Sequence, residues 1–245
     1  MKKLLIANFK MNKTTQETKE YVLAFGEMIN KTQNEIYLCL PYTSLHVSSL
    51  FPSKIKLGAQ NVAEEEEGSF TGEVSAKMLK DEKVDLVLVG HSERRKHFHE
   101  TNQSINKKIK TCLNHGLKVV LCVGETKTQR NIKKTKQVLT SQIEEGLNGI
   151  YENELKNIII AYEPVWAIGT GNTATIPDIN GASAIIREII SNHYSKKAGE
   201  NQKIIYGGSI NSGNAKQILK SNEICGLLVG GASLNPNEFA KIVIS

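Results

Sequence analysis

The stretch NIIIAYEPVW, residues 157–166, contains the pattern that decides the fold of this chain. Residues 157–162 form a short apolar run rich in isoleucine, as expected of a strand that is buried on both faces. The polar residue Glu163 follows at once, and a segment with helical spacing comes further along the chain. This order predicts a β-strand, a turn and then an α-helix.

Similar runs recur along the chain, each followed by a polar or glycine-rich turn and then by helical spacing. We predict eight strands, at residues 4–8, 36–40, 55–60, 84–90, 117–123, 157–162, 203–206 and 226–229. Thr14 and Glu17 match a capping box, which predicts a helix after the first strand with Val22, Phe25 and Ile29 on its apolar face. Later helices are predicted after Pro177 and from Asn235-Pro236.

Eight such units in 245 residues favour the α/β class and a single (β/α)₈ TIM barrel that spans residues 1–245 as one domain. A doubly wound open sheet would show the same alternation, but no dinucleotide glycine fingerprint follows the first strand. No linker rich in proline or serine divides the chain, and the acidic run from Glu64 to Glu67 is interpreted as a solvated loop.

The composition is that of a soluble globular protein, with 40% hydrophobic and 23% charged residues. Asn8 and Lys10 interrupt the first apolar run, so we expect no signal peptide. No apolar run in the sequence approaches membrane-spanning length, so we expect no membrane partner. The net charge of +6 is spread along the chain, which argues against a nucleic-acid partner. Isolated cysteines favour a reducing compartment, and we expect a cytoplasmic protein; they are Cys39, Cys112, Cys122 and Cys225.

Polar side chains follow several of the predicted strands, and in a barrel these strand ends meet at one mouth. The residues concerned are Asn8, Lys10, His91, Ser92, Glu93 and Glu163. Each also has a simpler interpretation: Lys10 as a solvated lysine, His91 as the residue ahead of a helix capped by Ser92, and Glu163 as a loop carboxylate. Their convergence on one mouth favours a functional site.

A carboxylate base, an imidazole and a lysine suit proton transfer next to a carbonyl, a reaction that needs no metal or organic cofactor. The glycine-rich ends of the last two strands, Gly207-Gly208-Ser209 and Gly230-Gly231-Ala232-Ser233, leave N–H groups open to a phosphate. His91, His97 and His99 are poor candidates for metal ligands, because helical residues two apart point in different directions. We therefore expect no cofactor and a small phosphorylated substrate.

Four motifs make the sequence resemble the triosephosphate isomerase family over essentially its whole length. They are GHSERR at 90–95, LCVGE at 121–125, AYEPVWAIGTG at 161–171 and YGGS at 206–209. The resemblance implies a cofactor-free interconversion of glyceraldehyde 3-phosphate and dihydroxyacetone phosphate, in glycolysis and gluconeogenesis.

The resemblance also implies a role for each catalytic residue. Glu163 is the base, His91 serves the two oxygens of the enediolate, Lys10 supplies positive charge and Asn8 positions the substrate. Glu93 matches the helix carboxylate beside the family's site. In this family a helix N-terminus is known to keep the histidine neutral, and His91 stands just ahead of a helix start.

By the same resemblance, a lid begins at Pro164 and has an apolar tip of Val165, Trp166, Ala167 and Ile168, with Leu228 as the partner of Ile168. A core position for Trp166 is the alternative. Phosphate is expected on the backbone N–H groups of Gly169, Ser209, Gly230 and Gly231. Lid closure would remove water from the base and protect the intermediate.

A homodimer is expected from the resemblance, because in the family the loop equivalent to residues 68–73, which includes Thr71, reaches a neighbouring subunit near Met11. A simple surface loop would have the same composition. The chain departs from the family at Asn172, where a lysine is common after the lid, and at Cys225, where an aspartate often pairs with the arginine equivalent to Arg187.

Two other functions are compatible with such a barrel. An aldolase or synthase would share the phosphate site but commonly uses a Schiff-base lysine, for which Lys10 is the comparable residue. A catalytically silent barrel would act by binding alone, and the presence of Asn8, Lys10, His91 and Glu163 argues against it.

Overall fold

The predicted barrel is confirmed: eight parallel strands close on themselves in a computed structural model that describes residues 2–30, 32–168 and 173–245. The strands are β1 (Leu4–Asn8), β2 (Glu35–Leu40), β3 (Ile55–Ala59), β4 (Leu86–Val89), β5 (Lys118–Val123), β6 (Ile158–Tyr162), β7 (Lys203–Tyr206) and β8 (Gly226–Val229). Pairing of Leu4 with Gly226 and of Ala7 with Val229 joins β1 to β8 and closes the barrel.

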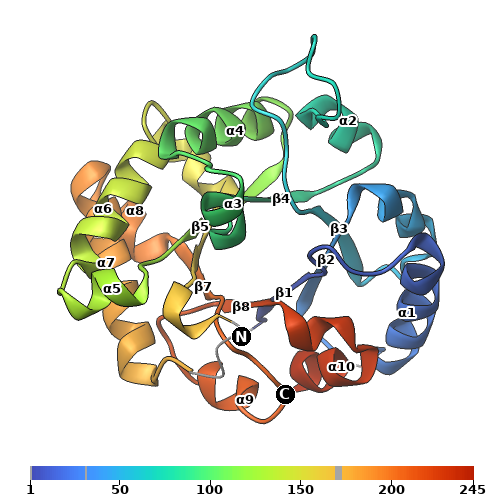
Figure 1. Cartoon of the computed structure of the whole chain (residues 1–245). Helices are drawn as coiled ribbons and strands as arrows, with labels where there is room; N and C mark the ends of the chain where they lie inside the picture. Colours follow the sequence, from blue (N-terminus) through green and yellow to red (C-terminus); the bar gives the residue numbers. More distant parts are fainter. Residues whose placement is uncertain (1, 31, 169–172) are drawn as a thin grey trace.

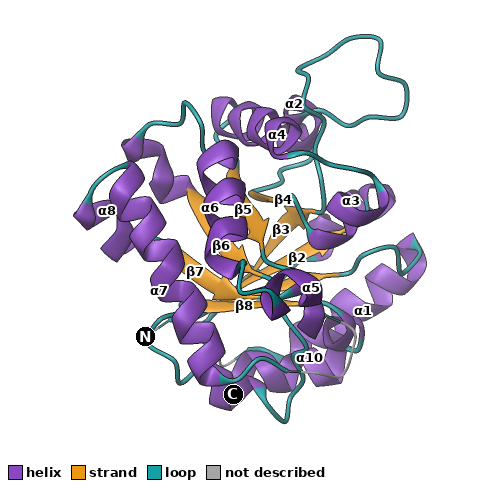
Figure 2. Ribbon diagram, turned by 60° about the vertical axis from the view of Figure 1, so that its left-hand side comes forward, coloured by secondary structure: helices purple, strands orange, loops and turns teal. Residues whose placement is uncertain are grey.

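The helices surround the barrel (Figures 1 and 2). They are α1 (Thr15–Met28), α2 (Ala76–Asp81), α3 (Ser92–His97), α4 (Asn102–Asn114), α5 (Lys127–Asn131), α6 (Thr135–Gly146), α7 (Ile176–His193), α8 (Lys196–Asn201), α9 (Ala215–Ile218) and α10 (Pro236–Ile244). Four 3₁₀ helices complete the described elements: η1 (Tyr42–Leu50), η2 (Glu152–Asn157), η3 (Val165–Ala167) and η4 (Gly231–Leu234). None of the described helices is long and apolar enough to cross a membrane.

Successive residues of each strand face opposite sides of the sheet, and this alternation builds two apolar layers. In β1, Leu4 and Ile6 belong to the cluster inside the barrel, together with Leu88 of β4 and Ala161 of β6. Leu5 and its neighbours of the opposite parity pack instead against the surrounding helices. Burial on both faces explains the continuous apolar runs of the sequence.

The strand bounds agree with the sequence prediction to within one residue, except in the fourth strand. There the prediction of 84–90 is too long, because β4 starts at Leu86. Val84 belongs to the end of the preceding helical turn, where its N–H donates to the carbonyl of Leu79 at 3.0 Å. Gly90 leaves the strand with a φ of +72°, which ends the extended conformation.

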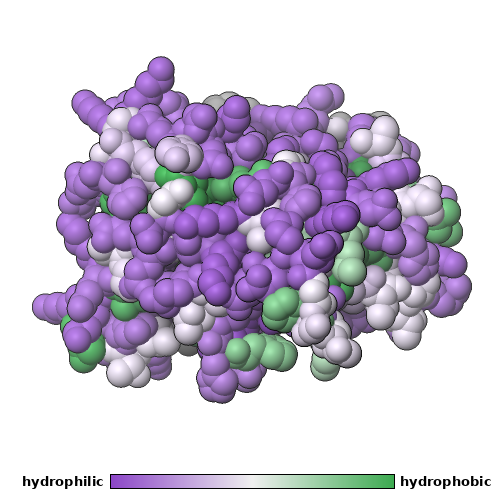
Figure 3. All heavy atoms as spheres, turned by 90° about the horizontal axis from the view of Figure 1, so that it is seen from above, coloured by the Kyte–Doolittle hydropathy of each residue, from purple (hydrophilic) through white to green (hydrophobic). Residues whose placement is uncertain are grey.

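The predicted helix starts are also present. Thr14 and Glu17 form the capping box of α1, and Asn235 caps α10 by accepting hydrogen bonds from two backbone N–H groups. The loop between β3 and α2 projects away from the barrel (Figures 1 and 2), and its Phe70 is 49% exposed. The face in Figure 3 is mainly hydrophilic, with apolar side chains in small groups.

Candidate active site

The C-terminal ends of β1, β4 and β6 bring together Asn8, His91 and Glu163, which lie up to 155 positions apart by their numbering. All three side chains are buried, with exposed fractions of 5%, 6% and 3%. A parallel barrel explains the convergence, because every strand ends at the same mouth. The structure thus brings together the central residues that the sequence indicated.

The imidazole of His91 lies between two glutamates. Its Nε2 is 3.2 Å from Oε1 of Glu163, while its Nδ1 accepts the backbone N–H of Glu93 at 3.2 Å. Because Nδ1 is an acceptor, the ring proton resides on Nε2 and can be donated toward Glu163. The second carboxylate oxygen of Glu163 accepts the backbone N–H of Ser92 at 3.3 Å.

The interpretation of Ser92 as the cap of α3 is wrong. His91 itself is the N-cap residue, and Ser92 is the first residue of the helix. An imidazole nitrogen therefore accepts the backbone N–H that a hydroxyl or carboxylate oxygen usually accepts at a helix start. The start of α3 and the orientation of the His91 ring thus depend on the same hydrogen bond.

Lys10 reaches the same mouth from the end of β1. Its Nζ lies 2.5 Å from Oε1 of Glu93, and its backbone N–H donates to Oδ1 of Asn8 at 3.0 Å. Its φ of 52° lies in the left-handed region, an unusual conformation for a lysine. Burial would raise the pKa of Glu93, but the Lys10 hydrogen bond and nearby positive charge outweigh it and lower that pKa.

Glycines allow close approach at the ends of β7 and β8. A Cβ on Gly207 would lie 3.0 Å from Cγ of Glu163 and 3.4 Å from Cβ of Leu228. A Cβ on Gly230 would lie 3.1 Å from Cε of Lys10, so the end of β8 lies directly beside the lysine, and a Cβ on Gly231 would meet no described atom within 4 Å. These backbones line the mouth without filling it.

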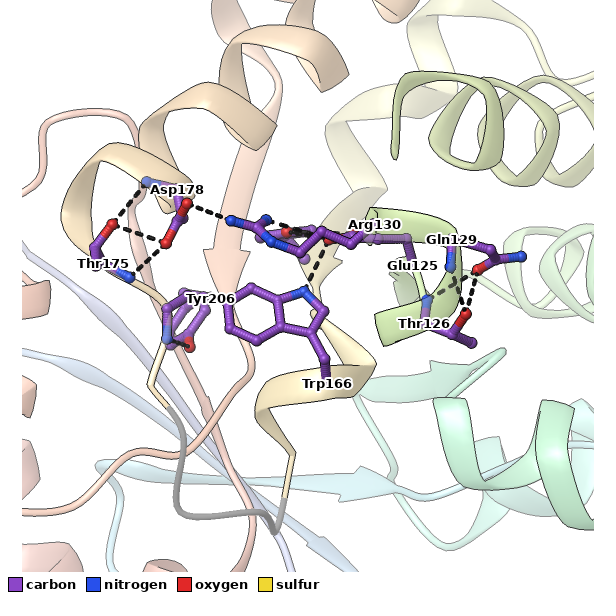
Figure 4. A network of polar contacts seen from close by, with 10 residues as sticks. Glu125, Thr126, Gln129, Arg130, Trp166, Thr175, Asp178 and Tyr206 are labelled. Carbon is purple, nitrogen blue, oxygen red and sulfur yellow. Dashed lines mark hydrogen bonds and ion pairs between the residues drawn. The ribbon is translucent and has the colours of Figure 1, made fainter. Parts of the chain in front are cut away.

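The segment that follows Glu163 is held by polar contacts. Ser209 donates its backbone N–H and its hydroxyl to the carbonyl of Ala167, at 3.0 Å and 2.6 Å. The indole of Trp166 donates to Oε1 of Glu125 at 2.9 Å, and the Arg130 guanidinium lies 4.4 Å from the indole ring (Figure 4). Ile168 is partly buried, and Gly169 lies outside the described residues.

Sequence reasoning assigned no role to three residues that support this site. Glu125 is fully buried and also accepts the Tyr162 hydroxyl at 3.2 Å. A Cβ on Gly124 would lie 1.9 Å from the carbonyl oxygen of Glu163. Arg95 lies behind the turn that carries His91. One signal was present for Glu125, because it follows the fifth strand much as Glu163 follows the sixth.

Met11 and Thr71, the two expected dimer contacts, are both exposed in the single chain, Met11 with an exposed fraction of 97%. Among the residues that the structure describes, no three His, Cys, Asp or Glu side chains gather closely enough to hold a metal ion.

The fold and the residues gathered at its mouth define a (β/α)₈-barrel enzyme. The chain belongs to the triosephosphate isomerase family, whose sequence profile matches residues 3–245. The family and the isomerase class expected from the sequence motifs are thereby confirmed.

Relatives named triosephosphate isomerase align with the chain from end to end. The relative from Dictyoglomus thermophilum is 48% identical over 247 residues, which cover 100% of this chain and 99% of the relative. The one from Aquifex aeolicus is 48% identical over 248 residues and covers 100% of both chains. The one from Alkaliphilus metalliredigens is 47% identical over 246 residues, with 99% of each covered.

Proposed function

We propose that the chain interconverts glyceraldehyde 3-phosphate and dihydroxyacetone phosphate through an enediolate, as a step of glycolysis and gluconeogenesis. Membership of the triosephosphate isomerase family supports the reaction. The observation that carries the assignment of residues is the 3.2 Å contact between Nε2 of His91 and Oε1 of Glu163, two buried groups at one barrel mouth.

In this mechanism Glu163 removes the proton from the carbon next to the carbonyl and returns it to the neighbouring carbon. His91 donates its Nε2 proton to the oxygen on which charge develops, since its Nδ1 is occupied by the N–H of Glu93. Lys10 balances the charge of the enediolate, and Asn8 orients the substrate at the end of β1. Glu93 holds both Lys10 and His91 in place.

The phosphate group is proposed to bind the N–H groups of Ser209, Gly230 and Gly231, together with that of Gly169. Ser209 N–H donates to Ala167 in the free chain, so this bond has to open when phosphate arrives. Pro164 to Ile168 would then close over the site, with Leu228 as the apolar partner of Ile168. Exclusion of water would strengthen Glu163 as a base and protect the intermediate.

A homodimer of single-domain subunits in the cytoplasm completes the proposal. Met11 is almost fully exposed beside the active-site residue Lys10, and the projecting loop around Thr71 carries the exposed Phe70. Apolar side chains in such positions are suited to burial against a second copy of the chain. The four cysteines are free thiols, as a reducing compartment favours.

An aldolase mechanism is less well supported. A Schiff-base lysine must attack a carbonyl as the neutral amine, whereas Lys10 is ion-paired with Glu93 at 2.5 Å. Borohydride trapping with substrate distinguishes the two mechanisms, because an isomerase forms no covalent adduct.

The test is a coupled assay of glyceraldehyde 3-phosphate conversion with wild type, Glu163→Gln and the surface control Glu188→Gln. Loss of a general base lowers turnover by about 10²- to 10⁴-fold or more, so Glu163→Gln is expected to lose activity on that scale. Glu188→Gln, which alters an exposed ion pair, should match the wild type. An inactive wild type that is folded and dimeric would contradict the proposed reaction.

A further inference from the structure

Arg95 is a partly buried arginine of α3 that the proposed mechanism does not use. Within the described parts of the chain its guanidinium forms no ion pair, and its partners are uncharged acceptors. Burial lowers the pKa of the Arg95 guanidinium, and negative charges including that of Glu163 oppose this shift. A partly buried cation that contacts no carboxylate loses some of its hydration without gaining an ion pair, so the function of Arg95 must lie in its hydrogen bonds.

The hydrogen bonds of Arg95 join three elements of the barrel mouth. Nε donates to the carbonyl of Gly90 at 2.9 Å, Nη2 to the carbonyl of Cys122 in β5 at 3.3 Å, and Nη1 to Oδ1 of Asn102 at the start of α4 at 2.6 Å. The planar fork of donors on a guanidinium suits such divergent acceptors, and a lysine cannot reproduce it.

Two of these contacts lead directly to the catalytic pair. Gly90 immediately precedes His91, so the bond to its carbonyl holds the turn that presents the imidazole and the N–H of Ser92. Cys122 precedes Val123, whose carbonyl accepts the backbone N–H of Glu163 at 2.7 Å. Arg95 thereby links the turn before α3 to β5, the strand whose Val123 carbonyl accepts the backbone N–H of Glu163.

The packing around Gly90 is tight. A Cβ there would lie 3.2 Å from Nη2 of Arg95 and 2.8 Å from Cδ1 of Ile105. The guanidinium therefore lies directly against the backbone of the turn, where a shift of the side chain is transmitted to His91.

Arg95 and Glu163 also line one cavity of about 310 Å³ between α3 and the ends of β5 and β6. The charged or titratable groups that face Glu163 are His91 from the end of β4, Cys122 from β5, and Arg95 and Lys96 from α3. Lys96 is exposed to solvent, which screens its charge. The Arg95 guanidinium is instead held in a fixed position by its three hydrogen bonds.

We propose that Arg95 is a positioning residue of the active site, which fixes His91 and the Ser92 N–H relative to Glu163. The inference rests on the proposed isomerase activity for its kinetic consequences. Its structural part, the orientation of His91, is independent of that activity.

The test compares Arg95→Gln, Arg95→Lys and the control Lys96→Gln, a cation on the same helix and cavity that makes no described hydrogen bond. In Arg95→Gln, kcat is expected to fall by about 10- to 100-fold with less change in KM, since small displacements of catalytic groups cost up to about 10²-fold.

Arg95→Lys keeps the charge without the fork of donors. It should also lower kcat with less change in KM, and it carries the test if Arg95→Gln does not fold. Lys96→Gln should resemble the wild type in both quantities. Folded Arg95 variants with wild-type kcat and KM, or equal effects in Lys96→Gln, would overturn the proposal.

A second readout separates this inference from the proposed reaction. The ¹⁵N NMR signals of the His91 ring, assigned by their loss in His91→Gln, report the proton on Nε2 and the hydrogen bond to Nδ1. Arg95→Gln is expected to shift them, whether or not the chain turns over substrate. Unchanged His91 signals would refute the positioning role, while an inactive wild type would refute only the isomerase proposal.

Discussion

The indole Nε1 of Trp166 donates a 2.9 Å hydrogen bond to Oε1 of Glu125, which ties the segment after β6 to the loop between β5 and α5. The carboxylate is fully buried, and its other partners are the Tyr162 hydroxyl and Arg130. Figure 4 shows the Arg130 side chain next to the indole and directed toward Asp178, with which it pairs at 2.6 Å. Trp166 packs against the core, as the alternative interpretation expected, but its indole N–H also forms a hydrogen bond with Glu125.

Replacing Trp166 by Phe should therefore destabilise the chain while preserving an aromatic ring. A hydrogen bond to a charged group contributes about 1.5–3 kcal/mol, and a buried carboxylate that loses a donor pays a desolvation penalty. Urea unfolding followed by far-UV circular dichroism should show a loss in this range. An unchanged midpoint would show that the Trp166–Glu125 bond adds nothing to the folded state.

Gly124→Ala should disturb the catalytic base although it adds one methyl group. The new Cβ would lie 1.9 Å from the Glu163 carbonyl oxygen, a distance that requires the backbone to move. We expect at least about a tenfold loss of turnover, since misplacement by about 1 Å is costly. The matched control is Gly181→Ala in α7, where a Cβ meets no described atom within 4 Å and helix propensity favours alanine by about 1 kcal/mol.

Acid should weaken the chain through Glu100. Burial would raise the pKa of this carboxyl, but hydrogen bonds from Lys108 and Arg94 outweigh it and hold the pKa below its ordinary value of 4.5. Lys108 lies 2.5 Å from Oε1, and both side chains are about 95% buried, with exposed fractions of 6% and 5%. Since the folded-state pKa is lowered, this stabilisation is present above pH 4.5 and is lost as the pH falls through the lowered value.

Glu100→Gln should reduce the free energy of unfolding at pH 7 by about 3–5 kcal/mol, because it leaves the buried Lys108 ammonium without its carboxylate. The variant should then lose less further stability than wild type as the pH falls from about 5 to about 3. Urea midpoints measured across this pH interval test the prediction. The same pH dependence of the midpoint in variant and wild type would contradict the contribution assigned to Glu100.

Arg187 has a carboxylate partner although Cys225 replaces the aspartate that is common in the family. Its guanidinium pairs with Glu223, two residues before Cys225, with Nε 3.4 Å from Oε2. It also donates to the backbone carbonyls of Gly199 and Gln202 at 2.9 Å and 3.1 Å. Glu223→Gln should cost less than about 1 kcal/mol, since the pair is partly exposed. Arg187→Met should cost more, because buried carbonyls lose their donor. Thermal unfolding of both variants tests this order.

Cys225 should react slowly with thiol reagents. Burial raises the pKa of its thiol, although Lys203 and Lys3 lie near enough to oppose the shift. The thiolate is the reactive form, so alkylation by iodoacetamide at pH 8 should be slower than that of a free cysteine peptide. Mass spectrometry after timed exposure would show rapid single modification at Cys225 if this expectation is wrong.

The sequence by itself determined the barrel, the strand bounds to within a residue or two, and the convergence of Asn8, His91 and Glu163. It did so because buried parallel strands leave continuous apolar runs, and because closure of the barrel brings every strand end to one mouth. The start of β4 was misplaced because Val84 is apolar but bonds to the preceding helical turn.

Only the tertiary structure decided which residues hold this site in place. His91 as the cap of α3 was not evident, since histidine is an unusual N-cap and Ser92 is a common one. The contacts of Arg95 with Cys122 and of Trp166 with Glu125 join residues 27 and 41 positions apart. No local pattern encodes such pairs, because their distance depends on how neighbouring strands and helices pack rather than on spacing along one element.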